Sequence, residues 1–297
     1  MDRTPDWIAV DWGTSNVRAW AMTAAGEVLA EATSDKGMGK LSREEFEPAL
    51  LDLIGGWGPG PHRVVACGMV GARQGWIEAP YARVPGPPLP QGLTMAPTTA
   101  PGLSFGIVPG LCQMDPADVM RGEETKVAGF LALHPGWDGT LLLPGTHPKW
   151  ISVSAGEVVG FRTSLTGELF AALSGHTVLR HSVTTHGWDD AAFEAGVAEG
   201  LARPEALMNR LFGLRAESLL KGLQPPEARA RLSGLLIGAD LAGARAWWLG
   251  ARVALLGAGD LMDTWRAALR SQGVQPEEAD ATQATLAGLT EAWRRSQ

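Results

Sequence analysis

One pattern occurs twice in this chain: an apolar strand, a polar turn with a glycine, a second strand, another turn and a third strand. The first copy begins at Ile8 and the second at Leu141, about 130 residues later. Short apolar runs bounded by such turns are typical of buried strands. The repeat predicts two similar α/β domains that face each other. We expect them at residues 1–133 and 134–297, with the last helix packing back on the N-terminal domain.

Between and after the two copies, the pattern indicates helices and isolated strands. We expect a buried strand at 64–66 and a helix from Pro116 to Leu133. The stretch from Pro80 to Gly110 is dense in Pro, Gly and Thr, which predicts a long irregular loop of a kind that is usually functional. The second half is expected to contain a strand at 253–256 and helices at 166–173, 189–199, 226–249, 260–269 and 280–293.

The first polar turn has the residues of a phosphate-binding site. Gly13 would let the backbone approach a bulky anion. The amides and hydroxyls of Thr14, Ser15 and Asn16 could then donate to phosphate oxygens. Asp11, where the strand ends, could hold Mg²⁺ through water, because Mg²⁺ keeps several waters and takes few protein ligands. An ordinary hairpin turn with small polar residues is the alternative interpretation.

The second polar turn could supply the other half of this cradle. Gly145, Thr146, His147 and Lys149 place backbone amides, a hydroxyl and a cation directly after a buried strand. A later strand enters a turn with Gly257 and Gly259, where an adenine ring could lie against the backbone. Tight structural turns in an α/β protein would explain the same residues.

Acidic and basic residues beside these turns are candidates for catalysis and substrate binding. Glu123 and Glu124 are adjacent at the start of an expected helix, where carboxylates also simply complement the helix dipole. An acidic substrate would need an arginine as a carboxylate fork. The arginines that lie beside motifs are Arg18, Arg73, Arg121 and Arg162. Solvent-facing charge is the alternative for each of them.

Composition limits the class of protein. A net charge of −7 and the lack of a Lys/Arg cluster argue against a nucleic-acid surface. We see no signal peptide and no apolar stretch of membrane-spanning length, so no membrane partner is expected. Two cysteines within apolar stretches predict a reduced, cytoplasmic protein. Most of the twelve Trp are expected to pack in cores, whereas Trp12 and Trp76 lie within polar motifs and could line a pocket.

Four familiar sites are disfavoured. The segment 102–106 matches an esterase nucleophile elbow but lacks its strand–turn–helix context. Gly257 and Gly259 resemble part of a dinucleotide fingerprint, whose third position is here Met262. Histidines at 176, 181 and 186 would lie on different sides of a helix, which argues against a shared metal. No Walker A sequence is present.

Taken together, the motifs resemble the 2-dehydro-3-deoxygalactonokinase family, sugar-acid kinases of the actin, hexokinase and Hsp70 superfamily. The match spans nearly the whole chain, and its most specific blocks are R-G-E-E-T, P-G-T-H-P-K-W and T-G-E-L-F. The resemblance implies a duplicated ribonuclease-H-like α/β fold with ATP in the cleft between two domains. It also implies an enzyme that uses ATP and Mg²⁺ to phosphorylate the 6-hydroxyl of 2-dehydro-3-deoxy-D-galactonate.

The resemblance also suggests roles for individual residues. Related sugar kinases use an Asp in N-D-T as the general base, and Glu124 stands at the similar point, with Glu123 in reserve. Pro144 replaces an Asp that many relatives carry in the second phosphate turn. Arg73 and Gln74 are the first choices for binding the substrate carboxylate. The other expected substrate-binding residues are Arg18, Gly71, Trp76, Tyr81 and Arg121.

Several rival functions stay open at this point. One is a kinase for the epimeric 2-dehydro-3-deoxygluconate or another sugar acid, because a hydroxyl's configuration cannot be deduced from these motifs. Another is a nonenzymatic nucleotide switch or chaperone on the same fold. A sugar-sensing repressor is disfavoured, since no helix-turn-helix precedes residue 7. The sequence leaves the oligomeric state open, and a homodimer is one expectation.

Overall fold

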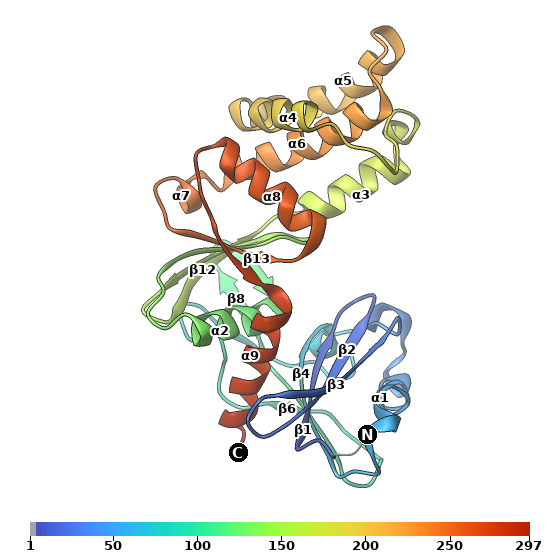
Figure 1. Cartoon of the computed structure of the whole chain (residues 1–297), viewed down its shortest axis with the longest axis vertical. Helices are drawn as coiled ribbons and strands as arrows, with labels where there is room; N and C mark the ends of the chain where they lie inside the picture. The colour runs from blue at the N-terminus through green and yellow to red at the C-terminus, as the bar shows by residue number, and fades with distance from the viewer. Residues whose placement is uncertain (1–3) are drawn as a thin grey trace. The chain divides into compact units, whose positions relative to one another are not determined.

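The computed structural model describes residues 4–297 and divides them into two compact units (Figure 1). The first unit comprises residues 4–137, 153–160 and 280–297, and the second comprises residues 138–152 and 161–279. The first unit is therefore built from both ends of the chain.

The first unit contains a six-stranded sheet, a three-stranded sheet and three α-helices among the described residues. Its larger sheet has the order β3-β2-β1-β4-β7-β6, and its smaller sheet has the order β5-β8-β9. The elements are β1 (Trp7–Trp12), β2 (Val17–Met22), β3 (Val28–Ser34), α1 (Phe46–Ile54), β4 (His62–Gly68), β5 (Tyr81–Arg83), β6 (Thr94–Met95), β7 (Leu103–Ile107), β8 (Gly110–Met114), β9 (Ala117–Met120), α2 (Glu123–Leu133) and α9 (Ala281–Arg295).

The second unit contains one five-stranded sheet, in the order β12-β11-β10-β13-β14, and a group of helices. Residues 153–160, at the tip of the β11–β12 hairpin, are grouped with the first unit. The elements are β10 (Gly139–Leu143), β11 (Lys149–Ser154), β12 (Glu157–Thr163), α3 (Thr166–His176), α4 (Asp190–Ala202), α5 (Leu207–Leu220), α6 (Pro225–Gly243), α7 (Arg245–Trp248), β13 (Val253–Gly257), α8 (Gly259–Ser271) and β14 (Glu277–Asp280).

The two larger sheets repeat one topology, which confirms the duplication. In the first unit β1 lies between β2 and β4 and pairs with β4 in parallel. In the second unit β10 lies between β11 and β13 and pairs with β13 in parallel. In both sheets, three strands that follow one another in the chain are neighbours. The fourth strand pairs in parallel with the first of them, on its other side. This is the duplicated ribonuclease-H-like fold of the actin-like ATPases.

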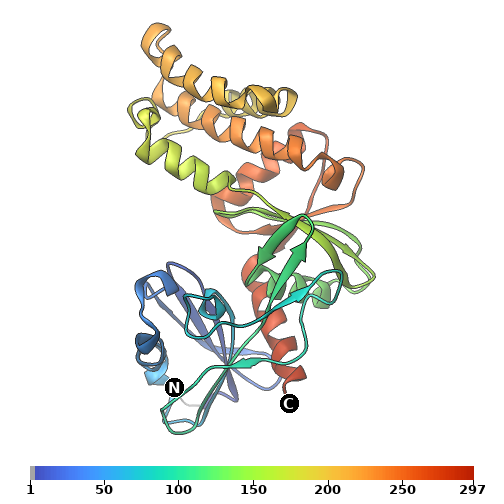
Figure 2. The same ribbon diagram turned by 180° about the vertical axis from the view of Figure 1, so that it is seen from behind.

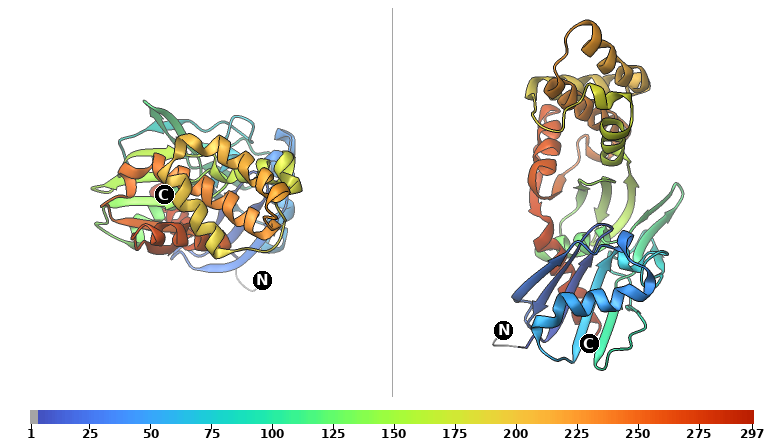
Figure 3. Two further views of the ribbon diagram at one scale, coloured as in Figure 1. Left: turned by 90° about the horizontal axis from the view of Figure 1, so that it is seen from above. Right: turned by 90° about the vertical axis from the view of Figure 1, so that its right-hand side faces the viewer.

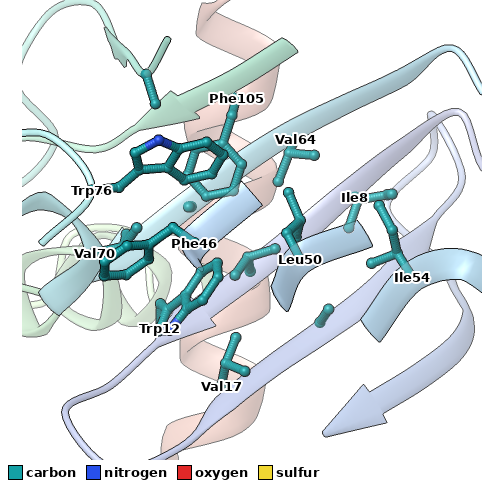
Figure 4. Packing of buried hydrophobic residues seen from close by; sticks show 14 of the residues in the cluster. Ile8, Trp12, Val17, Phe46, Leu50, Ile54, Val64, Val70, Trp76 and Phe105 are labelled. Carbon is teal, nitrogen blue, oxygen red and sulfur yellow. The ribbon is translucent and has the colours of Figure 1, made fainter. Parts of the chain in front are cut away.

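Successive side chains of β1 point to opposite faces of the sheet, and each face packs into a different hydrophobic core. Ile8, Val10 and Trp12 join α1 in a cluster rich in aromatic rings (Figure 4). In the right view of Figure 3, α1 lies across that face of the sheet. Trp7 and Ala9 point to the opposite face, where they pack with Leu289 and Ala292 of α9. The position of Asp11 in this alternation predicts that its side chain lies on the α9 side.

Close helix packing covers that second face. Helix α9 lies beside α2 (Figure 1), because glycines allow their backbones to touch. A Cβ at Gly288 would lie 2.0 Å from the carbonyl oxygen of Thr125, and one at Gly129 would lie 1.8 Å from that of Ala284. Any side chain at either position would push the helices apart.

The structure corrects several predicted elements. Residues 117–120 form strand β9, not the start of a helix, and the helix begins only after Gly122, whose φ of 100° is unfavourable for other residues. The segment 80–110 is not wholly irregular, because it contains β5, β6 and β7. Helix α5 and strand β14 were not predicted.

The long helix expected at 226–249 is two helices in the structure, α6 and α7. Its glycines do not interrupt α6. A Cβ at Gly234 or Gly238 would lie 2.3 Å from a backbone oxygen of α4, so these glycines serve the close α4–α6 packing. Figure 2 shows these helices as the yellow-to-orange group. Of the helices between residues 4 and 297, none is both long and apolar enough to cross a bilayer.

Candidate active site

Asp11 lies near the end of β1 and is held by an arginine on the neighbouring strand. Its antiparallel partner in the register is Arg18, which donates from Nη2 to Oδ2 at 2.9 Å. Arg18 also donates to the Thr282 hydroxyl on α9 at 3.1 Å. Because Arg18 is already paired in this way, the structure favours a supporting role for it over the expected contact with substrate.

The turn that follows Asp11 is closed by a backbone hydrogen bond of its own and is held by hydrogen bonds from the segment at 37–39. The Gly13 N–H donates to the Asn16 carbonyl at 2.9 Å, while Thr14, Ser15 and Asn16 are exposed. The Met38 and Gly39 N–H groups donate to the Gly13 and Thr14 carbonyls, each at 2.9 Å. A Cβ at Gly37 would lie 2.2 Å from the Ser15 carbonyl carbon. The segment at 37–39 therefore supports the turn, and its closely spaced glycines were the sequence signal that we missed.

The start of α2 carries the two candidate bases in different environments. The Glu124 side chain is fully buried, and it accepts from the Gly122 N–H at 2.6 Å and from the Thr125 hydroxyl at 3.0 Å. Burial, with the nearby charge of Glu123, raises the pKa of Glu124 to about 7. Glu123 is only partly buried and accepts from the Arg121 N–H at 3.0 Å. A carboxylate with a pKa near neutrality suits general-base chemistry.

Two glycines bring Asp11 and the start of α2 together. Gly68, at the end of β4, has a φ of 92°, and a Cβ there would lie 3.4 Å from Asp11 Oδ1. A Cβ at Gly122 would lie 3.1 Å from the Gly68 Cα. The end of β1, the end of β4 and the start of α2 therefore meet at one point of the first unit.

A lysine that we did not select from the sequence lies in the same cluster. Burial would lower the pKa of Lys126, but the carboxylates of Asp11 and Glu123 raise it above its ordinary value. Cys67 packs here as well, with Sγ 3.8 Å from Asp11 Oδ1. The R-G-E-E-T-K motif thus contributes a cation and two carboxylates to one cluster.

The expected substrate-binding residues at 71–81 divide into exposed and core positions. Arg73 and Gln74 are exposed, and the Arg73 carbonyl accepts from Arg43 at 2.8 Å. Trp76 is buried between Phe46 and Phe105, with ring centroids 6.1 and 4.6 Å away (Figure 4). Trp12 is buried in the same cluster. Both tryptophans belong to the aromatic core, which argues against the pocket-lining role we expected for them.

Gly71 and Tyr81, the remaining two residues of this set, lie beside a third expected residue, Arg121. The Arg121 guanidinium lies over the Tyr81 ring, 4.2 Å from its centroid. A Cβ at Gly71 would lie 3.0 Å from Arg121 Nη1. Tyr81, Gly71 and Arg121 are thus brought together.

In the second unit, the turn at 145–147 is packed tightly against the start of α3. The Glu168 N–H donates to the Thr146 carbonyl at 2.9 Å, and a Cβ at Gly167 would lie 2.5 Å from the Gly145 carbonyl oxygen. His147 Nε2 lies 2.6 Å from a Glu168 carboxylate oxygen, and Lys149 is largely buried. Contacts with α3 therefore fix the backbone of this turn. Among residues 4–297, a Cβ at Gly145 would have only the His147 backbone nitrogen within 4 Å, at 3.9 Å.

A pocket of about 790 Å³ opens beside this turn. Its walls are the turn at Gly145 and Thr146, residues of α3, the loop at 185–188, one face of α6 and the first turns of α8, all within the second unit. Arg229 lies on one wall, 5.1 Å from the centroid of the Phe170 ring. Gly257 and Gly259 are not among the lining residues, although Asp260 and Leu261 directly after them are. The volume is within the range of about 300–1,000 Å³ common for small-molecule sites.

Asp240, which we did not select, connects a pocket wall to residues that pack beside the turn at 145–147. It lies on α6 and accepts from Trp150 Nε1 at 3.1 Å, the Ser164 hydroxyl at 3.0 Å and the Thr166 hydroxyl at 2.5 Å. Thr166 precedes Gly167, which packs on the turn. Asp240 thus fixes the hairpin and the start of α3 to the helix that lines the pocket.

These residues fit a magnesium nucleotide. Gly145 and Thr146 of the turn line the pocket, as do the apolar residues Leu236, Ile237 and Leu261. Within residues 4–297, no group of three or more His, Cys, Asp or Glu side chains is arranged to hold a metal. Mg²⁺ in kinases usually takes only one or two carboxylates plus substrate phosphates. Asp11, with a partly exposed carboxylate, could supply such a ligand in the first unit, and Asp260 lines the pocket of the second unit.

Comparisons with known proteins agree on one family. Residues 11–292 match the family model described as 2-keto-3-deoxy-galactonokinase. A probable 2-dehydro-3-deoxygalactonokinase of Rhizobium meliloti is 41% identical over 97% of this chain and 96% of its own. The 2-dehydro-3-deoxygalactonokinase of Escherichia coli is 36% identical over 82% of this chain and 81% of its own. A crystal structure from Sinorhizobium meliloti, provisionally assigned to the same activity, superposes with a TM-score of 0.90 at 40% identity, covering 97% and 96% of the two chains.

Proposed function

The chain belongs to the 2-keto-3-deoxy-galactonokinase family and is a phosphotransferase, and we propose that it phosphorylates the 6-hydroxyl of 2-dehydro-3-deoxy-D-galactonate with ATP. The family match confirms the resemblance that the motifs indicated. The observation that carries the proposed reaction is the buried Glu124, with a pKa raised by burial to about 7, beside the Asp11 turn.

Phosphoryl transfer depends mainly on alignment and on neutralising the charge of the transferred group. In our proposal, the pocket of the second unit binds the adenosine part of ATP, and the Gly145–Thr146 backbone donates to its phosphates. The hydroxyls and amides of Thr14, Ser15 and Asn16 are the phosphate donors of the first unit. Asp11 would hold Mg²⁺ through water, and the ion when bound supplies positive charge to the phosphates.

Glu124 is the proposed general base. One carboxylate oxygen would accept the proton of the 6-hydroxyl while the hydroxyl oxygen bonds to the γ-phosphorus and the bond from that phosphorus to the bridging oxygen breaks, which releases ADP. Such a base is worth roughly 10²–10⁴ in rate. The Gly122 N–H and the Thr125 hydroxyl hold the carboxylate in one orientation. Glu123 is the reserve candidate, and its charge contributes to the raised pKa of its neighbour.

We also propose a cellular location and an oligomeric state for the enzyme. ATP use and two free cysteines, Cys67 and Cys112, favour a cytoplasmic enzyme. The expected homodimer stays a prediction that sedimentation analysis can test.

The test is ADP release by the purified protein, measured with ATP, Mg²⁺ and a panel of sugar acids. We expect turnover with 2-dehydro-3-deoxy-D-galactonate, little with its gluconate epimer, and loss of turnover when the metal is chelated. Faster turnover of the epimer would reassign the substrate. ADP release that is independent of any sugar acid would refute the kinase proposal and favour a nucleotide switch.

A further inference from the structure

Arg121 is a buried cation that forms no ion pair with an acid among residues 4–297. It is 8% exposed, and its Nη2 donates to the Ala79 carbonyl at 2.7 Å. Nε and Nη1 are both shielded from water, and neither has a hydrogen-bond partner among the described residues. Glu123, the nearest acid in sequence, contacts the Arg121 backbone N–H through Oε2.

The surroundings of the guanidinium do not replace the missing partners. The Tyr81 ring covers it at 4.2 Å, and a Cβ at Gly71 would lie 3.0 Å from Nη1. The cation–π contact with the Tyr81 ring partly compensates the positive charge. The ring face does not accept a hydrogen bond from the N–H groups, which point along the plane of the guanidinium. Buried donors without partners are rare in folded proteins, and each one needs a specific explanation. An anionic ligand that accepts from one of these two groups is such an explanation.

The position of Arg121 restricts which ligand this can be. Arg121 and the proposed base Glu124 belong to one short turn at the start of α2, on either side of Gly122. A molecule bound at this turn would present an anion to Arg121 and a hydroxyl to Glu124. The proposed substrate has a carboxylate at one end and the reacting hydroxyl at the other.

We propose that the Arg121 guanidinium, framed by Tyr81 and Gly71, binds the substrate carboxylate and selects sugar acids over neutral sugars. This inference rests on the proposed function. Tyr81 is 38% exposed, whereas Gly71, Ala79 and Arg121 are buried. The carboxylate therefore approaches from the side that the Tyr81 ring now covers.

Two other arginines fit this role less well. Arg73, our first choice from the sequence, is exposed to solvent, where a single charge pair discriminates weakly. Arg18 already pairs with Asp11. A phosphate of the nucleotide could also satisfy Arg121, so the test separates effects on the acid from effects on ATP.

The experiment compares kcat/KM for the sugar acid and for its uncharged methyl ester in wild type, Arg121→Met, Arg73→Met and Arg83→Met. Methionine keeps much of the arginine stem and removes the charge. Arg83 is the matched control, an exposed arginine on β5 two residues from Tyr81. For Arg121→Met we expect kcat/KM for the acid to fall about 10- to 150-fold, as for a lost charge-assisted hydrogen bond, with KM for ATP and kcat/KM for the ester nearly unchanged. Arg83→Met should match wild type.

Other outcomes would overturn the inference in distinguishable ways. Equal losses for acid and ester, a selective rise in KM for ATP, or loss of acid preference only in Arg73→Met would each refute it. A wild type that turns over no sugar acid would instead refute the proposed function. If Arg121→Met does not fold, calorimetry on wild type decides: the acid should bind at least tenfold more tightly than the ester, and equal affinities would refute the carboxylate subsite.

Discussion

Replacing Glu124 with Gln should remove the base and, at neutral and higher pH, stabilise the fold. The variant keeps the side-chain shape but cannot accept a proton, so kcat should fall by about 10²–10⁴. KM for ATP should change little, because the proposed adenosine pocket is lined by residues of the second unit.

The pH dependence follows from the raised pKa. A base must be deprotonated to act, so wild-type kcat should fall below about pH 7, the value to which burial raises the pKa of Glu124 from 4.5. In Glu123→Gln the neighbouring negative charge is gone, so this acid limb should move to lower pH. Glu124→Gln should lack the limb altogether.

The same pKa sets a stability difference between the two proteins. Because burial raises the pKa in the folded state, the folded protein holds its proton more tightly, and stability is lost as the pH rises from 4.5 through 7. At about 1.4 kcal/mol per pKa unit, the ionised carboxylate costs roughly 3 kcal/mol above pH 7. Urea unfolding should therefore show Glu124→Gln more stable than wild type by up to about 3 kcal/mol at pH 8, with little difference near pH 4.5.

The matched control for these measurements is Glu123→Gln, which removes the adjacent carboxylate and should reduce kcat far less. The reasoning fails if Glu124→Gln retains wild-type turnover. It also fails if its unfolding free energy has the same pH dependence as that of wild type. Collapse of kcat only in Glu123→Gln would transfer the role to that residue.

Three further predictions concern the scaffold. Asp240→Asn should raise KM for ATP several-fold without changing KM for the acid, because the Thr166 and Trp150 hydrogen bonds that hold the phosphate turn weaken; equal changes in both constants would contradict this. Gly288→Ala should lower the free energy of unfolding by about 1–3 kcal/mol or more, since its Cβ would lie 2.0 Å from the Thr125 carbonyl oxygen; thermal unfolding at the wild-type temperature would argue against the close packing. Phe105→Ala should cost about 3–5 kcal/mol in urea unfolding, because the fully buried ring packs against Trp12 and Trp76; a loss below 1 kcal/mol would mean that this core repacks freely.

Local patterns were sufficient for the repeated hairpins and hence for the duplicated fold. Alternating apolar residues and a glycine turn define each hairpin within a short segment, so neither copy depends on distant contacts. The helix predicted from Pro116 was wrong at its start. Residues 117–120 pair with β8 in a tight antiparallel hairpin, and that pairing outweighed the apolar pattern that had indicated a helix.

The site was harder to predict because chemical residue type does not determine burial. Arg73 and Arg121 both lie beside motifs, yet the fold exposes the first and buries the second. Trp76 lies within a polar motif, but it packs between Phe46 and Phe105, which come from other segments. The local sequence gives Asp240 no feature that distinguishes it from other acids in helices. Its role depends on hydrogen bonds from Trp150, Ser164 and Thr166, which folding brings to it. These roles depend on tertiary contacts that no local window contains.

The discontinuity of the first unit has a consequence for synthesis in the cell. Helix α9 follows the entire second unit in the chain, yet it packs on α2 at Thr125 and Gly129 and lies against β1 and β4. A nascent chain therefore exposes the apolar surface of Trp7, Trp20 and Val65 until α9 arrives. This core is completed only after the second unit has been synthesised, and general chaperones should be needed most during that interval.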